Sequence, residues 1–143
     1  MFVKQISVFI ENRPGRLAEF TQMLGKAGID LIALSIADTT NFGVLRAIVN
    51  DSEKAFKVIQ DGGYTVNITE VLAVAVPDQP GGLGTVLKLL DDNSISVEYL
   101  YSFVRRVKDS AVVIFRVDRP EESAKLLTEK GVRLLTQEEV AIA

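Results

Sequence analysis

The 143-residue sequence contains no histidine, no cysteine and no tryptophan, and it has only four prolines. Without cysteine, it has no disulfide, no thiolate nucleophile and no sulfur ligand for zinc or an iron–sulfur cluster. Without histidine, it has no imidazole base and no Ser–His or Cys–His catalytic pair. A bound metal would have to be a hard cation held by oxygen ligands alone. These absences exclude most common catalytic sites, and we expect no cofactor and no metal.

The charge and the apolar runs exclude further classes of partner. The 16 basic and 19 acidic residues give a net charge of −3, and neither half of the chain is net positive, so we expect no nucleic-acid partner. The longest apolar runs, Val71–Val76 and Ala111–Phe115, are too short to cross a membrane. The N-terminus lacks the pattern of a signal peptide. We therefore expect a cytoplasmic protein without a membrane partner, and its positive mean hydropathy indicates that a second copy covers some apolar surface.

The sequence contains an internal repeat. At a shift of 66 residues, Pro14-Gly15 aligns with Pro80-Gly81. After an insertion of two residues near Val104–Lys108 the shift becomes 68, and Gly63 then aligns with Gly131. One small insertion over the whole length indicates a duplication, with units at residues 1–70 and 71–143. No linker rich in proline, glycine or serine separates the two halves, so we expect them to pack closely.

Each unit has the pattern strand, helix, strand, strand, helix, strand. In the first unit the predicted elements are Phe2–Ile10, Leu17–Ala27, Asp30–Ala37, Gly43–Val49, Ser52–Asp61 and Tyr64–Thr69. In the second unit they are Val71–Val76, Leu83–Asp91, Ser96–Val104, Ala111–Val117, Glu121–Lys130 and Val132–Thr136. A βαββαβ unit has one main compact arrangement, a four-stranded antiparallel sheet with both helices on one face. The prediction is therefore an α+β protein of two ferredoxin-like units in tandem.

The turn from the first strand to the first helix is the most specific local feature of each unit. It reads Glu11-Asn12-Arg13-Pro14-Gly15-Arg16-Leu17 in the first unit and Pro77-Asp78-Gln79-Pro80-Gly81-Gly82-Leu83 in the second. The Asn12 or Asp78 side chain can accept hydrogen bonds from backbone amides at the helix start, and the glycine admits a close ligand. The free amides of the helix start are suited to a carboxylate. A capped helix start without a ligand fits the same residues, and a duplication copies structural turns too.

The pattern Asn/Asp-x-Pro-Gly-x-Leu, with a helix that ends in Ala27-Gly28-Ile29-Asp30-Leu31, resembles the ACT domain. This domain is a small-molecule-binding regulatory module of amino-acid metabolism. The resemblance covers essentially the whole chain, twice. The stretch Glu11-Asn12-Arg13-Pro14-Gly15 is especially similar to the serine-sensing domain of phosphoglycerate dehydrogenases. In the second unit, Asp92-Asn93-Ser94-Ile95-Ser96 stands where the family usually has an Ala-Gly-Ile-Asn run.

The resemblance implies a free-standing tandem ACT protein that binds an amino acid at interfaces between ACT units. It implies a regulatory role, exerted on a metabolic enzyme or regulator in trans or through a change of oligomer, and a homodimer is expected. The ligand-binding residues that it implies are Asn12, Arg13, Pro14, Gly15, Asp30, Leu31 and Ile32 in the first unit, and Asp78, Gln79, Pro80, Gly81, Ser96, Val97 and Glu98 in the second.

Two other functions fit parts of the sequence. The first is a structural or protein-interaction dimer without a ligand. The second is an enzyme that uses carboxylates such as Glu11 and Glu98, or the tyrosines Tyr99 and Tyr101. The two tyrosines alternate along a predicted strand, which favours a packing role, and no group of residues has the spacing of a known catalytic set. We therefore expect a binding module and not an enzyme.

Overall fold

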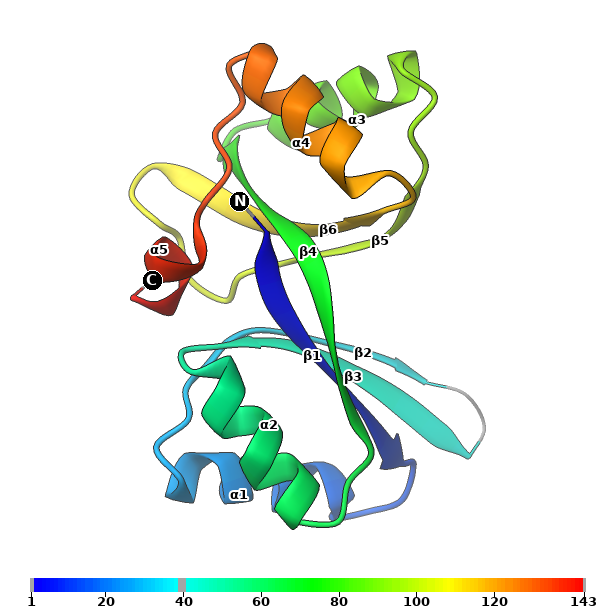
Figure 1. The fold of residues 1–143 in the computed structure, drawn as a ribbon, viewed down its shortest axis with the longest axis vertical. Helices are drawn as coiled ribbons and strands as arrows, with labels where there is room; N and C mark the ends of the chain where they lie inside the picture. The colour runs from blue at the N-terminus through cyan, green and yellow to red at the C-terminus, as the bar shows by residue number, and fades with distance from the viewer. Residues whose placement is uncertain (1, 39–40, 143) are drawn as a thin grey trace. The chain divides into compact units, whose positions relative to one another are not determined.

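The computed structural model describes residues 2–38 and 41–142 (Figure 1). It divides the chain into two compact units. The N-terminal unit is Lys4–Thr69, and the C-terminal unit consists of the described residues from Glu70 onward together with Phe2 and Val3. No helix among the described residues is both long enough and apolar enough to span a membrane.

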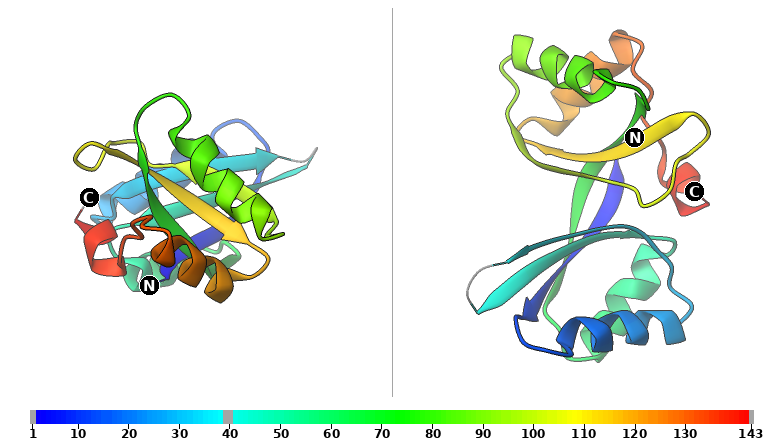
Figure 2. Two further views of the ribbon diagram at one scale, coloured as in Figure 1. Left: turned by 90° about the horizontal axis from the view of Figure 1, so that it is seen from above. Right: turned by 180° about the vertical axis from the view of Figure 1, so that it is seen from behind.

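The N-terminal unit is an antiparallel sheet with two helices on one face (Figures 1 and 2). Its strands lie in the order β2-β3-β1-β4, so that β2 forms an edge. Ile6 of β1 and Leu34 of β2 both lie opposite Ala47 of β3, which fixes the register. The elements are β1 (Val3–Glu11), α1 (Arg16–Lys26), β2 (Leu31–Asp38), β3 (Phe42–Val49), α2 (Ser52–Asp61) and the first part of β4 (Val66–Pro77).

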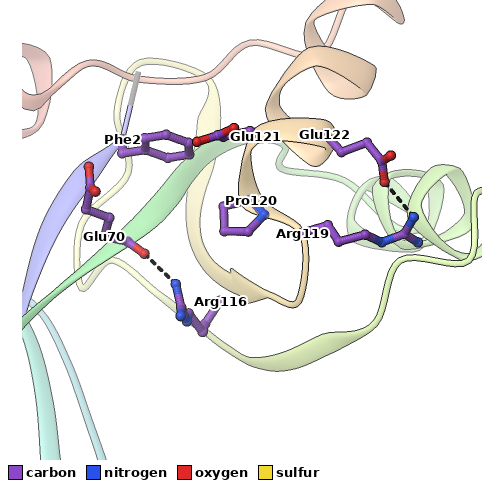
Figure 3. A pocket seen from close by; sticks show the side chains of 7 residues that line it. All are labelled: Phe2, Glu70, Arg116, Arg119, Pro120, Glu121 and Glu122. Carbon is purple, nitrogen blue, oxygen red and sulfur yellow. Dashed lines mark hydrogen bonds and ion pairs between the residues drawn. The ribbon is translucent and has the colours of Figure 1, made fainter.

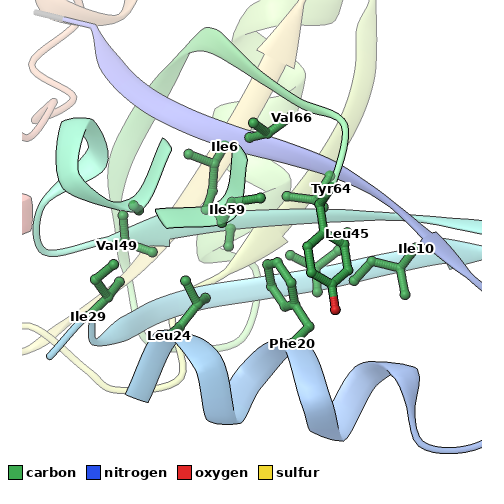
Figure 4. Packing of buried hydrophobic residues seen from close by; sticks show 13 residues of the cluster. Ile6, Ile10, Phe20, Leu24, Ile29, Leu45, Val49, Ile59, Tyr64 and Val66 are labelled. Carbon is green, nitrogen blue, oxygen red and sulfur yellow. The ribbon is translucent and has the colours of Figure 1, made fainter. Parts of the chain in front are cut away.

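The core of the N-terminal unit lies between this sheet and its helices (Figure 4). Alternate residues of β1 point into the core because side chains alternate between the two faces of a strand. Phe20 and Leu24 of α1 are fully buried against them. The Phe20 ring packs edge-on against Tyr64, with ring centroids 5.2 Å apart. These contacts hold the first turns of α1 in a fixed place relative to the end of β1.

The C-terminal unit repeats the arrangement. Its strands lie in the order β4-β6-β5, so that β5 forms an edge. The segment after α4 lies beside β4, because the Ala75 amide donates to the Arg133 carbonyl at 2.9 Å and the Leu135 amide to the Ala73 carbonyl at 2.8 Å. The further elements are α3 (Gly82–Asp92), β5 (Val97–Ser102), β6 (Ser110–Val117), α4 (Pro120–Glu129) and α5 (Gln137–Ala141).

The predicted α+β fold of two ferredoxin-like units is confirmed, with differences at two places. The predicted strands Tyr64–Thr69 and Val71–Val76 form one strand, β4, which runs through Glu70 without a break. The prediction of a strand at Val132–Thr136 is wrong. In this segment only Leu134 forms a β-bridge, and its partner is Val74. The chain leaves the sheet there because Thr136 caps the short helix α5.

Candidate functional site

The turn between β1 and α1 is closed by its own backbone. The Arg13 amide donates to the Glu11 carbonyl at 3.0 Å, and the Arg16 amide donates to the Arg13 carbonyl at 3.4 Å. Gly15 is the N-cap of α1 and has a φ of 88°, a left-handed conformation that favours glycine. The equivalent turn of the C-terminal unit is the same, with amide-to-carbonyl bonds from Gln79 to Pro77 (2.9 Å) and from Gly82 to Gln79 (3.0 Å), and with Gly81 at a φ of 84°.

The predicted side-chain caps by Asn12 and Asp78 are wrong. Neither α1 nor α3 has a side-chain cap hydrogen bond within the described residues. The backbone amide of Asn12 donates to the Asn41 carbonyl at 3.0 Å. The side-chain amide of Asn12 has no hydrogen-bond partner in the described part of the chain. Asp78 instead forms an ion pair with Arg106, with 2.7 Å between Oδ2 and Nε. Because the turn closes through its backbone, the Asn12 side chain is not required to hold it.

The start of α1 also presents free backbone donors. The first amides of an α-helix have no partner within the helix. Arg16 and Glu19 bond back to Arg13 and Gly15, but the amides of Leu17 and Ala18 have no partner among the described residues. Such amides at a positive helix end are suited to an anionic group.

A small cavity of about 90 Å³ lies beside this turn. Two of the predicted site residues, Asn12 and Arg13, line it, whereas Pro14 and Gly15 do not. Its other lining residues are Ile10, Glu11, Leu17, Ile36, Gly43 and Leu45. Sequence reasoning missed the apolar wall, although Leu17 belongs to the repeated turn motif. Leu17 is 41% exposed and Ile36 is 45% exposed, so this wall is open to solvent in the single chain.

The structure does not bring Asp30, Leu31 and Ile32 to this turn within one N-terminal unit. Asp38, at the end of β2, lies opposite Gly43, beside the turn, whereas Leu31 lies opposite Val49 at the other end of the sheet. The eight residues of β2 therefore separate the two predicted walls by roughly 25 Å. The amide of Asp30 donates to Oδ1 of Asn50 at 2.9 Å.

In the C-terminal unit, the predicted residues Gln79, Pro80 and Gly81 line a larger cavity of about 490 Å³. The other predicted residues of this unit do not line it. The Ser96 amide donates to Oδ1 of Asp118 at 3.1 Å, Val97 begins β5, and Glu98 forms a 3.3 Å ion pair with Arg116. The residues that sequence reasoning missed here are Ala75, Pro77, Gly82, Thr85, Val86, Ser110, Gly131, Val132 and Arg133.

A third cavity, of about 390 Å³, contains none of the predicted site residues (Figure 3). Its two arginines are engaged, because Arg116 donates to the Glu70 carbonyl at 3.0 Å and Arg119 lies 2.6 Å from Glu122. The rings of Tyr99 and Tyr101 stack on β5 with centroids 6.4 Å apart, as the packing interpretation predicts. Among the described residues, no group of three or more acidic side chains is placed to hold a metal ion.

One family model matches nearly the whole chain, and solved structures share its fold. The family model of the ACT domain pair matches residues 1–142. Among solved structures, protein BT0572 from Bacteroides thetaiotaomicron is 40% identical with a TM-score of 0.93, covering 100% of this chain and 98% of that one. The ligand-free regulatory subunit of aspartate kinase from Thermus thermophilus is 14% identical with a TM-score of 0.62, covering 88% of this chain and 91% of that one.

The aspartate kinase regulatory subunit from Thermus flavus is similar at the level of the fold, with 13% identity, a TM-score of 0.60 and 88% of each chain covered. No curated protein matches the sequence. The duplicated β1–α1 turn, the two ferredoxin-like units and the match over nearly the whole length lead to one conclusion: this chain belongs to the ACT domain pair family.

Proposed function

We propose that this protein is a regulatory module that binds a free amino acid at the β1–α1 turn of its N-terminal unit. The observation that carries the proposal is the combination of unpaired polar groups beside an open apolar wall. Within residues 2–38 and 41–142, the groups without a partner are the Asn12 side chain and the helix-start amides of Leu17 and Ala18. The apolar wall is the side of the cavity formed by Leu17 and Ile36.

Each part of an amino acid has a partner at this turn. The ligand carboxylate accepts hydrogen bonds from the free amides of α1. The ligand ammonium donates to the side-chain carbonyl oxygen of Asn12, because an ammonium carries only N–H donors and no acceptor atom. Glu11 and Arg13 already pair with each other at 3.2 Å, so neither brings an uncompensated charge to the cavity.

A second ACT unit completes the site in this proposal. Since β2 is an edge strand, the β2 edges of two copies can pair antiparallel. Such pairing brings the start of one β2, with Asp30, Leu31 and Ile32, beside the end of the other β2, near Ile36 and the turn. Residues that lie roughly 25 Å apart in one unit would then face each other across two copies. This geometry supports a homodimer and a ligand at its interface.

The regulatory role follows from the family, since ACT domain pairs are typically regulatory amino-acid-binding modules. Two structures that share the fold are regulatory subunits of aspartate kinase. We propose that the bound amino acid shifts the balance between two oligomeric or conformational states, and that a metabolic enzyme or regulator reads the change. A cytoplasmic location is part of the same proposal.

A thermal-shift screen over the twenty amino acids tests this function. A ligand at 100 times its Kd adds about 2.7 kcal/mol to the stability of the folded state, and each kcal/mol raises Tm by roughly 2–4 °C for a chain of this size. We expect one amino acid, or a few related ones, to raise Tm by several degrees. Analytical ultracentrifugation with and without that amino acid shows whether the dimer is coupled to the ligand.

The variant Asn12→Ala should remove the shift, because it deletes the free side-chain amide without touching the backbone bonds of the turn. Asp78→Ala is the matched control at the equivalent position of the C-terminal unit, and it should keep the shift. The competing function, a structural dimer without a ligand, predicts that none of the twenty amino acids changes Tm. A shift that survives in Asn12→Ala would place the ligand elsewhere.

A further inference from the structure

The cavity beside the β1–α1 turn has a polar mouth and an apolar floor. The polar residues that line it are exposed, and they are Glu11, Asn12 and Arg13. The residues that form its floor are buried, and they are Ile10, Gly43 and Leu45. None of the three floor residues carries a polar side chain. A ligand with a charged head group and an apolar side chain fits this division.

The sheet register explains why the floor is apolar. Ile10 of β1 lies opposite Gly43 of β3, and Ile36 of β2 lies opposite Leu45 of β3. Residues that lie opposite each other in an antiparallel pair point to the same face of the sheet. This face carries the core of the N-terminal unit, to which Ile10 and Leu45 belong (Figure 4). The cavity is therefore an extension of the apolar core that reaches the start of α1.

The floor offers no partner for a polar side chain of a ligand. Gly43 lies in the central strand β3, whose backbone pairs with β1 on one side and with β2 on the other. At the mouth, Nε of Arg13 lies 3.2 Å from Oε2 of Glu11, so the two charges compensate each other. A hydroxyl or a charged group that enters the floor loses its hydrogen bonds to water without gaining new ones. The cavity thus favours an aliphatic ligand side chain.

The size of the cavity limits that side chain to a few carbon atoms. One water molecule needs roughly 10–15 Å³ of such space, and the cavity offers about 90 Å³. Gly43 contributes to this space because it has no Cβ atom. A Cβ atom there would lie 3.5 Å from Cγ2 of Ile36 and 3.8 Å from the Ile10 carbonyl oxygen. These are ordinary van der Waals distances, so a methyl group fits at this place.

We propose that the amino acid bound at the β1–α1 turn is one with a branched aliphatic side chain: valine, leucine or isoleucine. This inference rests on the proposed function, because it names the ligand class of the same site. The head group of the ligand stays at the mouth with Asn12, and its side chain passes between Leu17 and Ile36 to the floor. Leu17 and Ile36, which are 41% and 45% exposed, are then covered by apolar atoms.

Isothermal titration of the full chain with valine and threonine tests the ligand class. The two amino acids have nearly the same shape, and threonine has a hydroxyl where valine has a methyl group. We expect threonine to bind roughly 10- to 100-fold more weakly, because the apolar floor leaves its hydroxyl without a partner. L-2-Aminobutyrate and serine differ in the same way and should show the same order. Aspartate and lysine should not bind.

The variant Gly43→Ala tests whether the ligand side chain occupies the floor. It adds one methyl group to the floor at distances that the surrounding residues tolerate. We expect it to weaken the binding of leucine by roughly tenfold and to change the binding of alanine, which has a shorter side chain, much less. Gly25→Ala is the matched control, because it adds the same methyl group on the exposed side of α1, where nothing lies within 4 Å.

The variant Ile36→Thr tests the wall of the cavity. It places a hydroxyl beside the ligand side chain and should reduce the preference for valine over threonine. Ile68→Thr is the matched control, since Ile68 is a similarly exposed isoleucine of β4 (39%) that does not line the cavity. It should keep the preference of the unmodified chain. Circular dichroism and Tm verify that each variant is folded.

The outcomes separate this inference from the proposed function. If none of the twenty amino acids binds, the proposed amino-acid site is wrong, and the inference is wrong with it. If an amino acid binds and Asn12→Ala abolishes its binding, the proposed site stands. In that case, threonine that binds as tightly as valine, or a Gly43→Ala variant with an unchanged preference for leucine over alanine, overturns the ligand class alone.

Discussion

Ser94 occupies a backbone conformation that the other repeat assigns to glycine. It has a φ of 57°, and the equivalent Gly28 has a φ of 76°. The hydrogen bonds around the two residues match, since Gly28 and Ser94 both follow a helix and donate at 3.0 Å to the carbonyls of Gly25 and Asp91. The duplication has kept the turn while changing the residue. A non-glycine residue in the left-handed region is held there at a cost of about 1–2 kcal/mol.

The variant Ser94→Gly should therefore stabilise the protein. We expect a gain of about 0.5–1 kcal/mol, because the relief of strain exceeds the added freedom of glycine in the unfolded chain. Chemical denaturation of the purified variant measures the change. Ser94→Ala keeps the Cβ atom and should give no gain, and Gly28→Ala should destabilise the protein. A Ser94→Gly variant less stable than the parent would show that the serine side chain, and not the backbone angle, determines stability here.

At the scale of the element, sequence patterns predicted the strands and helices that have both an apolar face and a terminating residue. The helix Ser52–Asp61 was predicted to the residue, because it has an apolar face and Gly62-Gly63 follows its end; in the structure, Asp51 caps its start. β4 was predicted as two strands because the duplication marks a boundary at Glu70. The boundary between two sequence repeats does not have to interrupt a strand, and β4 continues across it from Val66 to Pro77.

Helix α5 was missed because five residues are too few for a periodic apolar pattern. Its capping box is nevertheless visible in the sequence as Thr136 followed three residues later by Glu139. The Thr136 amide donates to Oε1 of Glu139 at 3.0 Å, and the Glu139 amide donates to Oγ1 of Thr136 at 3.2 Å. Val140, fully buried, anchors the helix to the unit. Removal of the cap in Thr136→Ala should cost about 0.5–2 kcal/mol.

The same capping box makes the stability depend on pH. The hydrogen bond from the Thr136 amide, together with that from Arg133, lowers the pKa of Glu139 in the folded protein. A lowered folded-state pKa means that the carboxylate stabilises the fold above its ordinary pKa of about 4.3, and that this contribution is lost as the pH falls through the folded-state pKa. Glu139→Gln should thus lower Tm at pH 7, with a smaller difference from the parent in acid. Glu138→Gln, which removes one carboxylate of the same helix outside the capping box, is the matched control for the loss of a charge.

At the scale of the whole molecule, the repeat indicated two units, but it did not reveal how their cavities differ. The turn motif led to Asn12 and Arg13, which line a cavity, because its residues are local in sequence. The apolar residue Ile36, from another strand, was not predicted as part of the site, because it joins the turn only through sheet pairing. The cavity of the C-terminal unit is lined by residues from several elements, which only the folded chain brings together.

The C-terminal unit is also discontinuous in sequence, since it includes Phe2 and Val3 from the start of the chain. Phe2 packs, partly buried, against the apolar core of this unit, and Val3 is fully buried. Truncation of Phe2 should therefore destabilise a unit that begins some 70 residues later in the chain. We expect Phe2→Ala to cost about 1–2 kcal/mol, less than the 3–5 kcal/mol of a fully buried phenylalanine.

Hydrogen exchange measured on the Phe2→Ala variant shows which of the two units has lost stability. Amides of β6 and α3, which belong to the C-terminal unit, should exchange faster than in the parent, because local opening of a unit follows the stability of its own core. Amides of β3 in the N-terminal unit should change less. The matched control is Phe9→Ala, since Phe9 is 49% exposed and its truncation should change stability by less than about 0.5 kcal/mol. Faster exchange confined to the N-terminal unit would contradict the assignment of the first residues to the C-terminal core.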